Sequence, residues 1–138
     1  GGSQSPAEQV PADEAARRAN LAQTDLESIT DDELRRVLGT GPVCRFAYSS
    51  GAEAVAAAKA PGSGEGRGVI KLHGRLVPMS ARYQSLAAEG FELSSDDVRL
   101  VTAPYERGNG EGARDAEARL HIGNELDAGY GGFYECTR

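Results

Sequence analysis

The stretch GVIKLHGRLVPM, residues 68–79, carries the clearest indication of the fold. Ile70 and Leu72 alternate with polar residues, which is the two-residue period of a β-strand. The step from His73 to Gly74 then supplies residues suited to a tight turn, and a second apolar run follows it. The sequence therefore predicts an antiparallel hairpin whose first strand turns Ile70 and Leu72 toward a core.

Four further segments alternate in the same way and extend the predicted sheet. They are VCRFAYS at 43–49, DVRLVTA at 97–103, ARLHIG at 118–123 and GYGGFYEC at 129–136. Their inward faces would carry Cys44, Phe46, Tyr48, Leu100, Leu120, Ile122, Tyr130, Tyr134 and Cys136. Short alternating segments between glycine-rich turns are typical of antiparallel β proteins. The expected fold class is mainly β, a small antiparallel β-barrel or sandwich of about seven or eight strands, with a short N-terminal helix.

Three segments between these strands have a less regular composition. Residues 61–68, PGSGEGRG, and residues 106–115, ERGNGEGARD, are expected to be exposed and mobile loops. Residues 49–62, SSGAEAVAAAKAPG, contain enough alanine to favour a helix. Their neighbours favour a strand over residues 53–59, since β pairing often overrides helix propensity. We expect the strand and keep the helix as the alternative.

Three regions are expected along the chain: a flexible tether over residues 1–23, an N-terminal helix over 24–40 and a β domain over 41–138. The tether is polar and alanine-rich, and such a composition buries too little apolar surface to offset the entropy of ordering. In the second region, Thr30 and Glu33 have the spacing of a capping box. They predict that a short amphipathic helix begins directly after Thr30.

Charge is unevenly distributed between the two ends of the chain. Residues 1–39 carry eight acidic and four basic residues, whereas residues 40–138 carry thirteen acidic and eleven basic ones, within a net charge of −6. Proteins bind the phosphate backbone of nucleic acids through a concentrated basic face. The nearly balanced charge of residues 40–138 does not predict such a face. We therefore expect no nucleic-acid partner.

Cys44 and Cys136, the two cysteines of the chain, lie at the two edges of the predicted β domain. Each shares a strand face with aromatic residues, so both sulfurs would point into the core. A closed antiparallel sheet places its first and last strands side by side, which brings two Cα atoms to the roughly 5.5 Å that a disulfide requires. A disulfide is therefore expected, and it implies an oxidising compartment such as the periplasm. Two unrelated buried thiols in a cytosolic protein remain the alternative.

The polar residues form no recognisable catalytic or metal-binding motif. His73 and His121, the two histidines, are expected to face solvent. Asp96 and Asp97 have the pattern of a turn before a strand. Two cysteines and two distant histidines lack the paired spacing of a zinc site, and residues 61–68 lack the Lys-Ser/Thr end of a phosphate-binding loop. We expect no enzyme activity, no cofactor and no metal.

A small single-disulfide β-barrel behind a polar tether resembles the membrane-bound and periplasmic inhibitors of c-type lysozyme. The resemblance rests on CRF at 44–46, the hairpin at 68–79, SARY at 80–83 and the terminal-strand cysteine at 136. It implies that Ser80, Arg82 and Tyr83 contact lysozyme from a segment that enters the enzyme's cleft. The Ser-Gly step of that family is absent, because Ala81 follows Ser80 and no glycine precedes them.

A broader similarity relates this layout to uncharacterised proteobacterial lipoprotein domains and implies no activity. GGSQSP, residues 1–6, resembles the polar spacer that follows a cleavage or lipidation site. Contact with a membrane is expected only through an N-terminal lipid anchor. The expected function is that of a non-enzymatic envelope domain, periplasmic or tethered to the outer membrane, which binds an unknown protein or envelope ligand. Inhibition of c-type lysozyme through Ser80–Tyr83 is the alternative.

Overall fold

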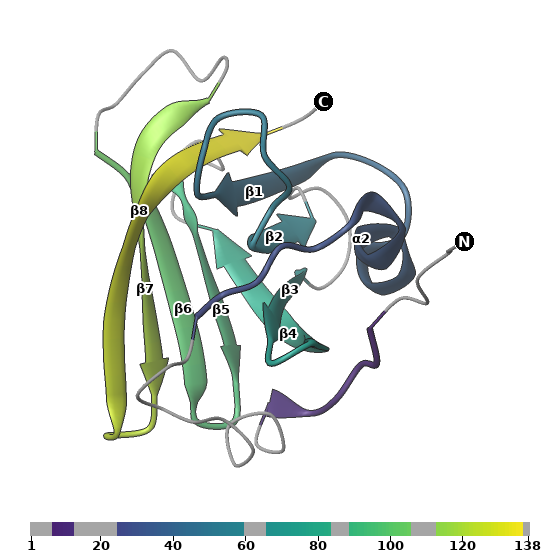
Figure 1. The fold of residues 1–138 in the computed structure, drawn as a ribbon, viewed down its shortest axis with the longest axis vertical. Coiled ribbons are helices and arrows are strands. Elements are labelled where there is room, and N and C mark those ends of the chain that lie inside the picture. The colour runs from purple at the N-terminus through teal and green to yellow at the C-terminus, as the bar shows by residue number, and fades with distance from the viewer. Residues whose placement is uncertain (1–6, 13–24, 60–65, 84–88, 106–112, 137–138) are drawn as a thin grey trace.

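The computed structural model describes residues 7–12, 25–59, 66–83, 89–105 and 113–136. Within them, eight antiparallel strands close into one barrel in sequence order, and the helix α2 (Asp31–Leu38) lies outside it (Figure 1). The strands are β1 Val43–Ala47, β2 Ala56–Lys59, β3 Arg67–Leu72, β4 Arg75–Tyr83, β5 Phe91–Ser95, β6 Val98–Pro104, β7 Arg114–Ile122 and β8 Leu126–Cys136. The predicted fold class is confirmed, and the barrel rather than the sandwich is the observed form.

The predicted hairpin is formed by β3 and β4. Their register pairs Leu72 with Arg75, and the two turn residues, His73 and Gly74, both have positive φ angles, 49° and 75°. Positive φ at both central residues is the geometry of the tight hairpin turn that matches the twist of the strands. Ile70 and Leu72 are fully buried in the barrel, as the alternation predicts.

The strand predicted over residues 53–59 is present as β2, in spite of its alanine content, but it covers only Ala56–Lys59, and residues 53–55 precede it outside the sheet. Ala56 and Ala58 face the barrel interior, whereas Ala57 belongs to a second apolar cluster beneath α2. All three are fully buried. A strand covered on both faces has room for small side chains only, so burial overrides the helix propensity of alanine.

Helix α2 begins as the capping box predicts. The Oγ1 atom of Thr30 accepts a hydrogen bond from the Glu33 N–H at 3.1 Å, and the Thr30 N–H donates to Glu33 Oε1 at 3.0 Å. These bonds satisfy backbone donors that a helix N-terminus otherwise leaves unpaired. Leu34, Val37 and Leu38 are buried against the outer face of β2 and β3. The helix therefore covers one side of the barrel.

Residues 7–12, expected to lie in a tether, pack against the barrel instead. The Val10 N–H donates to the Leu76 carbonyl at 2.8 Å, and the Leu76 N–H donates to the Glu8 carbonyl at 2.7 Å. Val10 is 3% exposed and Ala12 is fully buried. The first half of β4 has no partner in β5, so its open edge supplies the backbone groups that order this segment. Other residues of the expected tether, 1–6 and 13–23, lie outside the described residues.

The helix expected over residues 24–40 is confined to Asp31–Leu38, because residues 25–30 and 39–40 are not helical, and residue 24 lies outside the described residues. Leu26 forms an isolated bridge with Leu72 at the end of β3, and it is 2% exposed. Ile29 also pairs through its N–H with the carbonyl of Ala54 at 2.7 Å. Backbone pairing with the barrel replaces the helix in this stretch.

Tyr48 was predicted to face the core with Cys44 and Phe46, and this prediction is wrong. Strand β1 ends at Ala47, so Tyr48 leaves the alternation and is 40% exposed. Its hydroxyl donates to the Leu26 carbonyl at 2.7 Å. The residue therefore holds the extended N-terminal segment against the barrel rather than filling the interior.

A buried ion pair joins the N-terminal segment, α2 and β3. Glu33 is 2% exposed, and its carboxylate accepts hydrogen bonds from the Ala7 N–H at 2.7 Å and from Lys71 Nζ at 3.1 Å. Burial alone would raise the pKa of Glu33, but the bonds from Thr30, Ala7 and Lys71 together hold it below its ordinary value. Lys71 lies on the outer face of β3, yet its side chain is only 17% exposed.

Candidate functional site

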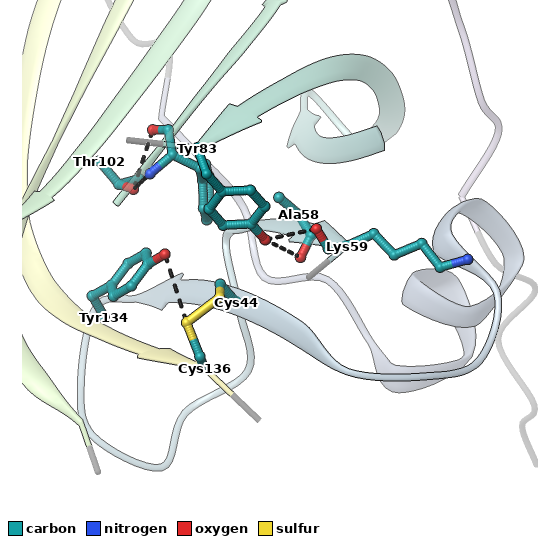
Figure 2. Close-up of a disulfide and its surroundings, with 8 residues drawn as sticks. Cys44, Ala58, Lys59, Tyr83, Thr102, Tyr134 and Cys136 are labelled. Carbon is teal, nitrogen blue, oxygen red and sulfur yellow. Dashed lines mark hydrogen bonds between the residues drawn. A yellow bond between two sulfur atoms is a disulfide. The ribbon is translucent and has the colours of Figure 1, made fainter. Parts of the chain in front are cut away.

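A disulfide closes the seam at which the barrel's first and last strands meet. Cys44 of β1 and Cys136 of β8 stand directly opposite each other in the register, with Cα atoms 3.9 Å apart (Figure 2). They are separated by 92 positions in the sequence, and Cys44 is fully buried. The predicted pairing of Cys44 with Cys136 is therefore present, at the strands from which it was inferred.

Aromatic rings fill the barrel interior beside this disulfide. Tyr134 is 1% exposed, and its hydroxyl lies 3.7 Å from Cys136 Sγ. The rings of Tyr134 and Phe91 have centroids 5.8 Å apart, and Phe91 also meets Tyr83 edge to face at 6.1 Å. Burial raises the pKa of both tyrosines above the ordinary value. Both phenols stay protonated at neutral pH, and the rings act as packing groups.

The three residues expected to contact lysozyme do not form a projecting segment. Ser80–Tyr83 is the end of β4, which pairs with β5 from Ser80 opposite Ser94 to Tyr83 opposite Phe91. Because side chains alternate along the strand, the three residues do not share one face of the sheet. Ser80 and Arg82 are exposed on the outer face, whereas Tyr83 packs against the core.

Tyr83 also ties β4 to β2. Its hydroxyl lies 2.7 Å from the carbonyl oxygen of Lys59 and 3.1 Å from that of Ala58, and it donates to this pair of acceptors (Figure 2). A tyrosine that is half-buried and hydrogen-bonded to backbone is held in place. It is not available to enter the cleft of another protein.

The histidines and the paired acids lie apart from one another in the fold. His73 is exposed in the β3–β4 turn, and His121, on the outer face of β7, has its Nδ1 atom 3.7 Å from Asp127 Oδ1. Asp96 and Asp97 form the β5–β6 turn, as predicted. Among the described residues, no three His, Cys, Asp or Glu side chains come together as a metal site would require.

Both segments predicted to be exposed glycine-rich loops, residues 61–68 and 106–115, run into strands at their C-terminal ends. Residues 61–65 and 106–112 lie outside the described residues. At the ends of the two segments, Arg67 and Gly68 belong to β3 and Arg114 and Asp115 belong to β7, so these residues are strand rather than the predicted loop. Within the described part of the chain, no helix has the length and apolar character needed to cross a membrane.

A groove that the sequence does not predict runs along the outer face of the barrel beneath the C-terminal end of α2. Its volume is about 690 Å³, and its walls carry the cationic side chains of Arg35, Arg36, Lys59 and Arg67. The hydroxyl-bearing Ser80 and Ser95 also line it. These residues come from α2, β2, β3, β4 and β5. Only the closed barrel assembles them, so no local motif could have identified the set.

Of the three predicted binding residues, Ser80 alone lines this groove. Arg82 borders a neighbouring hollow of about 200 Å³ with Glu92 and Ser94. The smaller hollow holds one cation and one carboxylate, so it has no excess of positive charge. The groove beneath α2 is the more distinctive surface.

A family described as a domain of unknown function, DUF6692, matches residues 2–138 of the chain. No curated protein and no solved structure matches it. The family match covers the barrel, α2 and the N-terminal segments together, and it brings no activity with it. What the protein does has to be argued from its own geometry.

Proposed function

We propose that this chain, which belongs to the DUF6692 family, is a non-enzymatic binding domain that works in the bacterial envelope, outside the cytoplasm. The observation that carries the proposal is the disulfide between Cys44 and Cys136 at the barrel seam. Structural disulfides persist in oxidising compartments and are rare where thioredoxin and glutathione keep thiols reduced. A bridge between the first and last strands would hold the barrel closed by restricting the freedom of the unfolded chain.

A binding role is supported by how the two faces of the barrel differ. The interior is filled by apolar and aromatic side chains, of which Phe46, Phe91 and Tyr134 are among the largest. Such a filled interior has the character of a rigid core. The outer face instead carries the cationic groove. A rigid body with a charged external groove suits recognition of a partner or ligand at its surface.

The test is the redox state of the cysteines in cells that make the protein. Thiols would be trapped by rapid acid quenching and labelled with a maleimide-linked polymer, before and after reduction, in each cell fraction. We expect no labelling before reduction, two labels per chain after it, and recovery in the periplasmic or membrane fraction. Protein that is labelled without reduction in the cytoplasmic fraction would exclude an envelope role.

Inhibition of c-type lysozyme is the second candidate, and the exposure of Ser80 and Arg82 on the outer face is what favours it. Its test is lysozyme activity in the presence of the oxidised protein and of an Arg82→Ala variant. Arg119→Ala, which removes an exposed cation from β7, away from Arg82, serves as the matched control. Inhibition at about 10 μM that is lost only with Arg82→Ala would establish this function, and its absence would reject it.

A further inference from the structure

The groove beneath α2 concentrates positive charge on a protein whose net charge is −6. No carboxylate of the described residues forms an ion pair with Arg36, Lys59 or Arg67. Arg35 pairs with Asp32, and both of these side chains are largely exposed, at 61% and 74%. No acidic side chain of the described residues lines the groove. Like charges held close together without counter-charges favour the binding of an anion.

The cations stand on rigid elements. Arg67 Nη1 donates to the Val37 carbonyl near the end of α2 at 3.2 Å, which positions its guanidinium beside the groove. Lys59 is the last residue of β2, and its carbonyl is held by the Tyr83 hydroxyl at 2.7 Å. Figure 2 shows the Lys59 side chain extending away from this bond toward α2. A site whose backbone is fixed loses little conformational freedom when a ligand binds.

The groove also supplies neutral donors and an apolar lining. Ser80 and Ser95 offer hydroxyl groups, and Val37, Leu38 and Met79 contribute apolar surface. Its volume of about 690 Å³ lies in the range of small-molecule sites, roughly 300–1,000 Å³. The combination suits an organic molecule that has charged ends and an apolar part.

We infer that the groove beneath α2 binds a small organic molecule carrying two or more phosphate groups. Guanidinium groups bind phosphate oxygens in a bidentate manner, and lysine adds a point charge. Arg36, Lys59 and Arg67, which form no ion pair with any of the described residues, together match the charge of a diphosphate, and serine hydroxyls are common donors to its oxygens. This inference rests on the proposed binding role, but it does not depend on the compartment.

The test uses the intact, oxidised protein and inorganic pyrophosphate as the probe, with titration calorimetry at about 0.02 M ionic strength, where screening is weak. Arg36→Gln and Lys59→Gln should each weaken pyrophosphate binding about 10- to 100-fold, the effect of losing one charge-assisted hydrogen bond. The matched control is Arg99→Gln, which removes the same charge from β6, outside the groove. It should change affinity less than about twofold.

Three results would overturn the inference. They are no binding of pyrophosphate up to about 1 mM, equal weakening by Arg99→Gln, and tighter binding of citrate than of pyrophosphate, which would assign the groove to carboxylates. Arg36 and Lys59 are exposed, so their variants should fold, and an unchanged thermal midpoint would verify this. The redox state of the cysteines in cells is measured separately, so failure here and failure of the envelope role remain distinguishable.

Discussion

Removal of the seam disulfide by Cys44→Ala together with Cys136→Ala should lower the free energy of unfolding by about 4–5 kcal/mol at 25 °C. The bridge spans 92 positions, and the loop-closure entropy for a chain of that length corresponds to about 4.6 kcal/mol. Both positions lie within paired strands, and alanine keeps the backbone hydrogen bonds. The loss should therefore come mainly from the greater freedom of the unfolded chain.

Urea unfolding followed by far-ultraviolet circular dichroism measures this change. The slope of the free energy against urea concentration should rise in the double variant, since an unfolded chain without a cross-link exposes more surface. Wild-type protein in a strong reductant should approach the double variant, whereas the double variant itself should not respond to reductant. A loss below about 1.5 kcal/mol would refute the reasoning, because it would mean that the unfolded chain gains little freedom when the seam is opened.

Three further predictions concern single side chains. Glu33→Gln should lower the free energy of unfolding by about 3 kcal/mol at neutral pH. Because the pKa of Glu33 is lowered in the folded state, the stabilisation by its carboxylate is present above pH 4.5. It is lost as the pH falls through the folded-state pKa. Urea unfolding from pH 7 to pH 3 measures it, and a difference independent of pH would contradict it. Gly132→Ala should cost more than about 2 kcal/mol, since a Cβ would overlap the Ala47 carbonyl oxygen, whereas Gly131→Ala has open space; equal thermal midpoints of the two variants would argue against this. Tyr83→Phe should cost about 1–2 kcal/mol through the lost hydroxyl bonds, while Tyr105→Phe, at a site 64% exposed, should leave urea stability unchanged; a similar loss in both would be inconsistent with the role given to Tyr83.

Most of the barrel could be predicted from local patterns. The turn at His73-Gly74 needs residues that accept positive φ, and both residues have it. The capping box at Thr30 and Glu33 depends on a three-residue spacing that the sequence displays directly. The disulfide followed from one additional step, namely that a closed sheet brings its first and last strands together. Each prediction required only neighbouring residues or a single topological rule.

The N-terminal segment and the groove could not be predicted in this way. Residues 7–12 are held in part by main-chain bonds to β4, which no side-chain pattern in the sequence specifies. The groove draws Arg36, Lys59 and Arg67 from three different elements, so their proximity exists only after the barrel has closed. The composition of residues 40–138 indicates a nearly balanced charge. A sum over so many residues does not reveal that positive charge is concentrated in the groove.

The pairing of the N-terminal residues with β3 and β4 bears on how the protein avoids self-association. Residues 8–10 and 26–27 bond to stretches of these strands that β2 and β5 leave open. Unpaired strand edges are templates onto which another chain can add a strand, and they promote aggregation. A chain cut at residue 41, where the β domain was expected to begin, would expose both edges at once. The N-terminal residues therefore cover the open strand edges and oppose aggregation of the protein. Any shortened version should begin no later than residue 7.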